Sequence, residues 1–299
     1  MKKVLTLAVV MLAALAIGIV FIQCGGDDNG ETCPAKCGVG LECCAACACA
    51  TGTCSAEGKC EVSDCCPSAP QGKYHIDIAG KVIDASTGLG TAVAVAAISP
   101  TEALTTSTPE LLVQTVSAAD GIFALDCFDV TNVALGAVIL TDDDPMDAAG
   151  GTYFPTGTGV IGWNTNAEKV CVSSAVAIAV PNAIVANFDQ LPDIDSATEG
   201  FVMGTVVSAE GAPVEGAVIK KTMDNGATWV DLDKVYYPIT GSTDMSGTAT
   251  SANGSYVLPA SNFVSITTIH AEKDGMTFDD AMVAATGGFC FFAMLPEAE

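Results

Sequence analysis

The densest group of side chains that could bind a metal ion lies in one short acidic segment. Asp142, Asp143, Asp144 and Asp147 occupy four of six consecutive positions. Calcium takes about six to eight oxygen ligands, many of them from carboxylates, so these four residues are candidate calcium ligands. The segment lacks the central glycine and the distal glutamate of an EF-hand loop. A solvated acidic loop is therefore the simpler interpretation.

The two histidines, His75 and His270, do not complete a catalytic motif. A zinc peptidase needs histidine and glutamate ligands at metal-binding spacing, and His75 is followed by Ile-Asp-Ile. His270 and Glu272 match the first half of a zinc deaminase motif, but no cysteine pair follows to complete it. The sequence also lacks a Gly-x-Ser-x-Gly elbow and a phosphate-binding glycine loop. We therefore expect neither enzymatic activity nor a cofactor.

Ten cysteines lie within residues 33–66, which contain few large apolar side chains. Hydrophobic burial cannot offset the folding entropy of such a segment, so covalent or metal cross-links are needed. An even number of cysteines in an exported segment favours disulfides. The candidate disulfide residues are Cys33, Cys37, Cys43, Cys44, Cys47, Cys49, Cys54, Cys60, Cys65 and Cys66, together with Cys127 and Cys171 later in the chain.

Cys127 and Cys171 are expected to pair with each other, because both lie in the predicted first domain. Cys290 is surrounded by phenylalanines and is expected to be a buried thiol. The adjacent cysteine pairs within residues 33–66 also look like the thiolate clusters of metallothioneins, which suit soft metals. That alternative, a thiol-based metal-binding protein, requires reduced thiols.

The N-terminal residues have the order of an export signal. Two lysines precede the apolar run 4–22, and Cys24 begins a tether rich in glycine and aspartate over residues 24–32. This arrangement resembles a bacterial lipoprotein signal, which implies a signal peptide over residues 1–23, acylation of Cys24 and a place at the outer membrane or cell surface. The apolar run is 19 residues long, close to the ~20 that span a bilayer. An uncleaved membrane anchor and plain secretion therefore stay open as alternatives.

The chain is strongly acidic, which excludes one class of partner. Aspartate and glutamate total 35 against 11 lysines and arginines, the formal net charge is -24, and no residue is arginine. Nucleic-acid binding requires lysine and arginine to neutralise phosphates, so we expect no nucleic-acid partner. The expected partners are the membrane, through the N-terminal lipid or anchor, and a protein or glycan ligand.

Beyond residue 73 the sequence has the pattern of short β-strands. Stretches rich in valine, isoleucine and threonine alternate with glycine, asparagine and aspartate, which favours a β-sandwich or barrel. Asp120-Gly121 and Asn253-Gly254 are hairpin-turn signals, and alternate residues after each turn are predicted to enter the core. Gly80 and Gly204 are predicted to mark a bulge or a close approach of two backbones.

This pattern occurs twice, which indicates tandem domains. The motifs of the second copy are Gly204-Thr205-Val206-Val207, Pro213-Val214 with Gly216-Ala217-Val218, and Asn253-Gly254-Ser255-Tyr256-Val257-Leu258. They resemble the carboxypeptidase regulatory-like domain, and the first copy lacks the Pro-Val of the central motif. The resemblance implies seven-stranded, transthyretin-like β-sandwiches in an accessory role, because these motifs specify a fold and no chemistry.

Aromatic residues are few, and one group of them could form a platform for a sugar. Packing inside the sandwiches is the simpler expectation for such residues. They are Tyr153, Phe154, Trp163, Trp229, Tyr236 and Tyr237.

The sequence therefore predicts an all-β protein with two tandem Ig/transthyretin-like β-sandwiches, preceded by a small disulfide-rich module and an N-terminal signal or anchor helix. The predicted order is a signal peptide (1–23), a tether (24–32), a Cys-rich module (33–66), a linker (67–73), a first sandwich (74–190), a second linker (191–199) and a second sandwich (200–299). The predicted function is a non-enzymatic structural, adhesive or ligand-binding role at the cell surface. Two alternatives stay open: a thiol-based metal-binding protein, and an accessory subunit of an envelope transport or enzyme complex.

Overall fold

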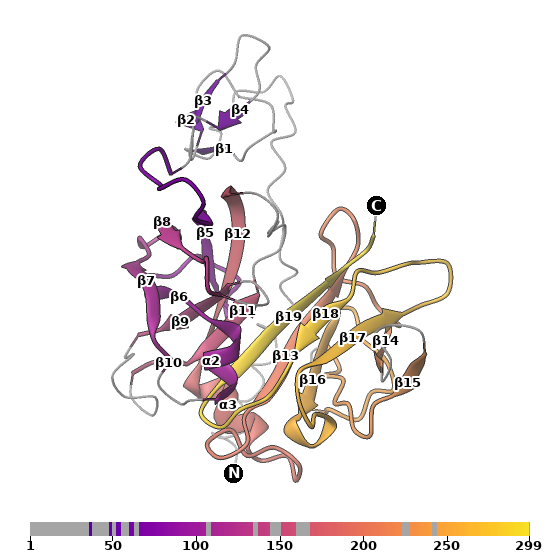
Figure 1. Ribbon diagram of the computed structural model, residues 1–299. Coiled ribbons are helices and arrows are strands. Elements are labelled where there is room, and N and C mark those ends of the chain that lie inside the picture. Colours follow the sequence, from indigo (N-terminus) through magenta and orange to yellow (C-terminus); the bar gives the residue numbers. More distant parts are fainter. Residues whose placement is uncertain are drawn as a thin grey trace.

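The computed structural model describes four short strands near the N-terminus and the chain from Cys66 to Ala298. Within this second part, gaps in the description fall at residues 106–108, 134–136, 144–150, 160–167, 223–227 and 241–243. Strands in several sheets make up most of the regular structure, and the described helices are short (Figure 1). The predicted all-β fold class is thereby confirmed.

The predicted signal peptide, Cys24 and most of the Cys-rich module lie outside the described residues. Within that module, β1 (Lys36–Cys37) pairs in parallel with β2 (Ala48–Cys49). The antiparallel pair β3 (Gly52–Cys54) and β4 (Cys60–Val62) follows. In the part of the chain that the structure describes, no helix is long and apolar enough to cross a membrane.

A four-stranded outer sheet with the order β10-β12-β5-β8 opens the body of the protein. Its strands are β5 (His75–Asp84), β8 (Ile122–Asp129), β10 (Tyr153–Phe154) and β12 (Lys169–Pro181). The parallel pairing of β5 with β12 is interrupted by a bulge between Val172 and Ala175. Any side chain at Gly80 would collide with the backbone of Ala175 there, so the predicted close approach at Gly80 is confirmed.

A seven-stranded central sheet with the order β16-β13-β19-β11-β9-β6-β7 runs through both predicted sandwiches. Its strands are β6 (Ala94–Ile98), β7 (Leu111–Val116), β9 (Val138–Asp142), β11 (Thr156–Gly159), β13 (Phe201–Val207), β16 (Ser255–Pro259) and β19 (Cys290–Pro296).

The link between the two halves of this sheet is β19. It lies between β11 and β13 and is parallel to both, with Phe291 opposite Gly157 on one side and Val202 on the other. The two predicted sandwiches therefore share one sheet, while their boundary at residues 191–199 stays a prediction.

A second outer sheet has the order β15-β14-β17-β18. Its strands are β14 (Val218–Thr222), β15 (Trp229–Asp231), β17 (Thr267–Glu272) and β18 (Ala281–Val283). With β13, β16 and β19 they give the second sandwich seven described strands, the number that the resemblance implies.

The two outer sheets cover opposite faces of the central sheet. Neighbouring residues of a strand point to opposite faces, and Ile139 and Leu140 of β9 lie in different cores. Ile139 packs in a core with residues of β5 and β12, whereas Leu140 shares a core with Phe291 and with Ile219 of β14. The body is thus a staggered three-layer arrangement of sheets.

Two short helices cover parts of the central sheet that the outer sheets leave uncovered. α2 (Pro100–Thr105) contributes Ala103 to the core that contains Leu140. α3 (Asn182–Phe188) buries Phe188 against Phe201, whose ring lies 5.6 Å away, in a third core. A single 3-10 turn, η2 (Ala260–Asn262), follows β16.

The two predicted glycine turns form, but the strands beside them differ from the prediction. Gly121 and Gly254 have φ of 87° and 65°, the left-handed values that favour glycine. The alternate residues that follow are buried as predicted: Phe123, Leu125, Tyr256 and Leu258. The prediction of hairpins was wrong, because β7 and β8 belong to different sheets and β16 pairs with β13 and not with the strand before it.

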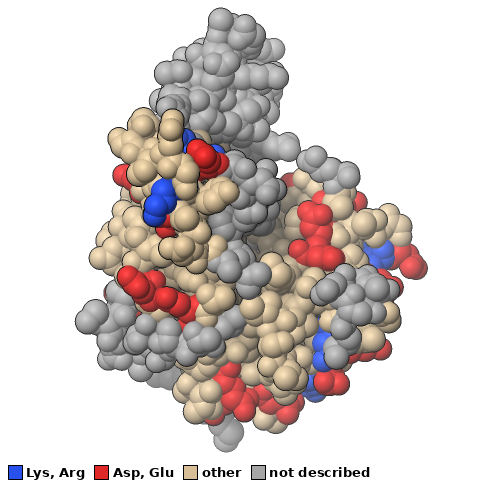
Figure 2. Space-filling view, viewed as in Figure 1, with Lys and Arg blue, Asp and Glu red and all other residues tan. Residues whose placement is uncertain are grey.

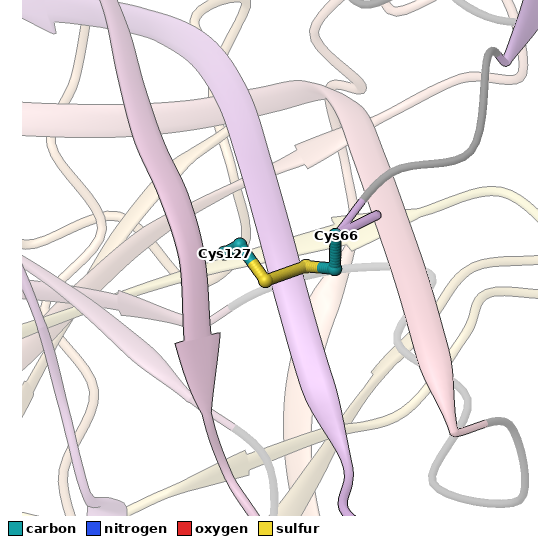
Figure 3. The surroundings of a disulfide bond; sticks show 2 residues. All are labelled: Cys66 and Cys127. Atoms are coloured by element: carbon teal, nitrogen blue, oxygen red, sulfur yellow. A yellow bond between two sulfur atoms is a disulfide. The ribbon is translucent and has the colours of Figure 1, made fainter. Parts of the chain in front are cut away.

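A disulfide links the end of the Cys-rich segment to the first outer sheet. Cys66 is bonded to Cys127 of β8 with a Cα–Cα distance of 5.1 Å (Figure 3). The predicted pair of Cys127 with Cys171 is therefore wrong, although Cys171 is disulfide-bonded as well. The bond within residues 74–190 was predicted from shared domain membership, which carries no information on which cysteines the fold brings together. Cys290 is a buried free thiol, as expected, and burial raises its pKa.

Candidate ligand-binding face

The outer side of the β15-β14-β17-β18 sheet carries two rows of side chains that run across the strands. Ile219, Ile269 and Ala271 point inward and are at most 1% exposed, so alternation puts their neighbours outside. The strand registers then give an uncharged row and a charged row. The first is Trp229, Thr222, Thr268 and Met282, of which Thr222 is only 8% exposed, and the second is Asp231, Lys220, His270 and Asp280. We call these eight residues the Trp229 face.

The charged row consists of one ion pair, Lys220 with Asp231, and one histidine–carboxylate hydrogen bond, His270 with Asp280. The Nζ atom of Lys220 donates to Asp231 Oδ1 at 2.5 Å and also lies 3.5 Å from Glu272 Oε2. The hydrogen bond with Asp231 raises the pKa of Lys220 above its ordinary value, against the effect of partial burial. On the other side, Nδ1 of His270 lies 2.8 Å from Asp280 Oδ1. The row therefore presents fixed donors and acceptors side by side.

The uncharged row contacts the charged row through a stack of two aromatic rings. The Trp229 and His270 rings are 4.8 Å apart between centroids, with an angle of 24° between their planes. Met282 at the far end of the row is 59% exposed. No helix in the described part of the chain packs on this side of the sheet.

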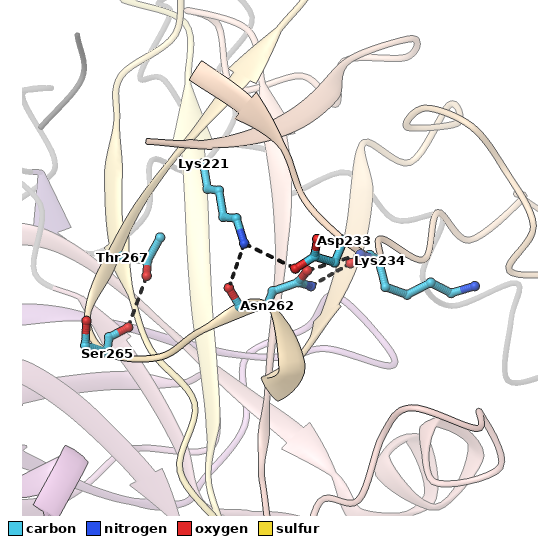
Figure 4. Close-up of polar contacts among 6 residues, drawn as sticks. All are labelled: Lys221, Asp233, Lys234, Asn262, Ser265 and Thr267. Atoms are coloured by element: carbon cyan, nitrogen blue, oxygen red, sulfur yellow. Dashed lines mark hydrogen bonds and ion pairs between the residues drawn. The ribbon is translucent and has the colours of Figure 1, made fainter. Parts of the chain in front are cut away.

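A buried asparagine, Asn262, fixes the loop that follows β15, the strand that begins at Trp229. The Nδ2 atom of Asn262 donates to the Lys234 carbonyl at 2.6 Å, and its Oδ1 accepts from the Lys234 N–H at 3.1 Å (Figure 4). Lys221 Nζ donates to the Asn262 carbonyl at 3.1 Å and lies 3.5 Å from Asp233 Oδ2. Asn262 is 3% exposed, so these bonds fix the loop after β15 on η2.

The loop after η2 continues to the start of β17. Thr267 Oγ1 donates to the Ser265 carbonyl at 3.1 Å. Val264 lies between η2 and Ser265 and is fully exposed. This loop therefore extends into solvent beside the residues that Asn262 holds.

The predicted calcium ligands do not form a described metal site. Asp142 is buried at the end of β9, and Asp143 accepts from the N–H groups of Thr152 and Tyr153 at 2.6 and 2.9 Å. Its carboxylate is thus occupied with backbone donors. Asp144 and Asp147 lie outside the described residues. Across the described residues, no group of three or more His, Cys, Asp or Glu side chains could hold a metal ion.

The other aromatic candidates are mostly core residues, in line with the simpler expectation. Phe154, Tyr236 and Tyr237 are at most 7% exposed. Tyr236 donates to Asp193 Oδ2 at 3.0 Å, and burial with this bond raises its pKa to about 12. Trp163 lies outside the described residues.

A shallow pocket lies beside α3. It has a volume of about 320 Å³ and is lined by Phe154, Val185, Ala186, Asp189 and Ser196 among others. The Asp189 carboxylate accepts from the N–H and Oγ of Ser196 at 2.9 and 2.8 Å. These two side chains therefore hold the loop after α3. Asn182 also lines the pocket and donates to the Gly151 carbonyl at 3.1 Å, and the remaining lining is apolar.

The Trp229 face is where polar and aromatic groups converge in the described residues. Sequence reasoning named Trp229 as a possible sugar contact and considered His270 only against a zinc deaminase motif, and it connected neither of them with Lys220, Asp280 or Met282. The strand register alone brings Trp229 to His270, which is 41 positions later. Alternation around Lys220 and His270 was the one signal in the sequence that could have found part of the face.

Comparisons with known proteins give no family. No family model matches the chain, and no curated protein is similar to it. A mutant of the shaft pilin SpaA from Lactobacillus rhamnosus GG is 11% identical, and the match covers 76% of this chain and 99% of the pilin with a TM-score of 0.23.

Two further solved structures are equally distant. The TIE protein of Bacillus anthracis is 10% identical, with 75% of this chain and 34% of that chain covered and a TM-score of 0.22. A minor pilin from Streptococcus agalactiae is 9% identical, with 75% and 95% covered and a TM-score of 0.22. At these TM-scores the similarity carries no argument about the function of this chain.

Proposed function

We propose that the chain is a non-enzymatic cell-envelope protein that binds a protein or glycan at the cell surface through the Trp229 face. The observation that carries the proposal is the stack of Trp229 on His270 beside a row of hydrogen-bonded polar and charged groups, on a side of the sheet against which neither described α-helix packs. Partly exposed tryptophan next to fixed polar groups is typical of contact surfaces.

The chemistry of the face fits a sugar or an uncharged peptide better than an acidic ligand. Its three carboxylates at Asp231, Asp280 and the neighbouring Glu272 face one lysine and one histidine. An indole face attracts weakly positive C–H groups because its π-system is negative there. Hydroxyl or amide groups of the ligand would then meet the donors and acceptors of the charged row.

The anchor belongs to the same proposal. Two lysines, the apolar run 4–22 and Cys24 support a lipid-anchored protein at the outer membrane or cell surface. The intact mass of the protein extracted from its own membranes tests this: we expect a chain that begins at an acylated Cys24. A mass that includes residue 1 would show an uncleaved membrane anchor instead.

The Trp229 face is tested by Trp229→Ala and Lys220→Ala in the full-length protein. We expect each variant to lose about tenfold or more in affinity, the range of an interface hot spot, when binding is measured to purified surface polysaccharide and surface protein of the native cells. Tyr74→Ala is the control, because Tyr74 is an exposed aromatic residue (39%) that directly precedes the first outer sheet and lies outside the Trp229 face.

Two outcomes would contradict the proposal. One is binding that Trp229→Ala leaves unchanged, and the other is equal loss in Tyr74→Ala. The alternative of a thiol-based metal-binding protein is less well supported, because Cys66, Cys127 and Cys171 are disulfide-bonded and so do not offer thiolates.

A further inference from the structure

Six described strands lie at the edges of the three sheets of the body, and five of them are protected. An edge strand exposes unpaired backbone groups that can template pairing with another chain, so proteins shorten, charge or cover their edges. β10, β15 and β18 have only two or three residues. β8 carries Asp126, Asp129 and the disulfide of Cys127.

The edge at β16 is covered. The N–H of Tyr236 donates to the Val257 carbonyl at 2.9 Å, and the N–H of Val257 donates back to the Tyr236 carbonyl at 2.9 Å. β16 also ends on Pro259, which cannot donate to a further strand.

The remaining edge, β7, is longer than β10, β15 and β18, and among the described strands it is hydrogen-bonded to β6 alone, although β8 follows it through the turn at Gly121 and lies beside it. Its six residues, Leu111 to Val116, carry no charge. The N–H of Ser117 donates to the Val93 carbonyl, so by antiparallel alternation the backbones of Gln114 and Val116 point away from β6. Gln114 is exposed and the Val116 side chain is 69% exposed.

We propose that β7 pairs antiparallel with β7 of a second copy of this chain. A two-fold axis through Gln114 places this residue opposite itself and brings Val116 opposite Leu112 of the second copy. The contact is self-complementary, as a two-fold dimer requires. It joins the two central sheets into one continuous sheet and covers the exposed Val116 side chain.

Charge favours a second copy as the occupant of this edge. Acidic groups outnumber lysines on the visible surface (Figure 2), and the chain carries a formal charge of -24. A basic partner would be drawn to the acidic faces and not to an uncharged strand. Two copies repel each other over most of their surface, so an uncharged edge is where they can meet, and added salt weakens the repulsion.

The test is the mass of the full-length protein in detergent, measured by native mass spectrometry and sedimentation at low and high salt. We expect a dimer that strengthens as salt rises. Val116→Lys places like charges on both sides of the two-fold axis. Gln114→Pro removes a backbone N–H that points away from β6, so no hydrogen bond to β6 is lost. Each is expected to weaken dimerisation by about tenfold or more.

Val264→Lys is the matched control, because it adds the same charge at a fully exposed valine far along the chain. It should leave the dimer unchanged, and thermal unfolding should show that all three variants are folded. A wild-type monomer at every salt concentration would overturn the proposal. So would a dimer that resists both β7 variants, or one that Val264→Lys weakens equally.

Discussion

Tyr153 illustrates how one side chain can hold two sheets together. Its hydroxyl donates to Asp84 Oδ2 at 2.7 Å and lies 2.9 Å from Thr91 Oγ1. Its backbone N–H donates to Asp143. Tyr153, which the sequence analysis named as a possible sugar contact, thus links β10 to the end of β5 and to the end of β9.

Asp84 in this network makes stability depend on pH. Burial raises the pKa of its carboxyl, but hydrogen bonds from Ser86, Tyr153 and Thr87 outweigh burial and lower it below the usual 3.8. A group with a lowered pKa in the folded state stabilises the fold above its unfolded pKa, and this stabilisation is lost as the pH falls.

We therefore expect Asp84→Asn to flatten the loss of stability between about pH 5 and pH 3. Urea unfolding across that range measures it. Glu199→Gln, which removes an exposed carboxylate elsewhere, should retain the wild-type slope. An identical slope in Asp84→Asn would contradict the role given to this carboxylate.

At the scale of elements, the contact of β11 with β19 decides whether the two halves form one body. Phe289, just before β19, packs over Gly157, and an added Cβ there would lie 2.5 Å from the ring. Gly159, two residues along the same strand, has open space at the corresponding position.

This difference makes Gly157 and Gly159 a matched pair for testing the shared sheet. Gly157→Ala is expected to destabilise the protein by about 1–3 kcal/mol through overpacking. Gly159→Ala should change stability by less than about 0.5 kcal/mol. Denaturant unfolding of both variants provides the measurement, and equal effects would show that the contact of Phe289 with β11 contributes nothing.

Local chemistry explains what the sequence could predict about these elements. Gly121, Gly254 and the buried alternation after each follow from neighbouring residues, because positive φ and two-residue periodicity are local properties. The insertion of β19 beside β11 was not predictable, because it joins residues more than 130 positions apart. The partner of Cys127 and the neighbours of Trp229 depend on the same long-range register.

At the scale of the whole molecule, the end of the Cys-rich segment and the linker after it are tied to the first outer sheet. Besides the bond of Cys66 to Cys127, Lys73 Nζ lies 3.1 Å from Asp129 Oδ2 and the Tyr74 N–H donates to Thr131 Oγ1 at 3.0 Å. All three contacts gather at the end of β8.

A protease site inserted between Ser68 and Gln71 tests this attachment. After cleavage, we expect the two fragments to migrate together on a gel without reductant and to separate once reductant is added, because the disulfide crosses the cut. Uncleaved protein treated with the same reductant is the control. Separation without reductant would show that the bond is not formed in the native protein.

The position of β19 in the chain also sets an order in time. A chain that crosses a membrane from its N-terminus delivers β11 and β13 long before β19. Until then, β11 and β13 each lack the neighbour that lies between them, and the central sheet exists as two separate pieces. Contacts so distant in sequence form slowly because a long loop must close first. Under the export that we propose, folding would be coupled to translocation: the central sheet is complete only once β19 arrives, and we expect a chain cut short before Cys290 to be degraded by proteases.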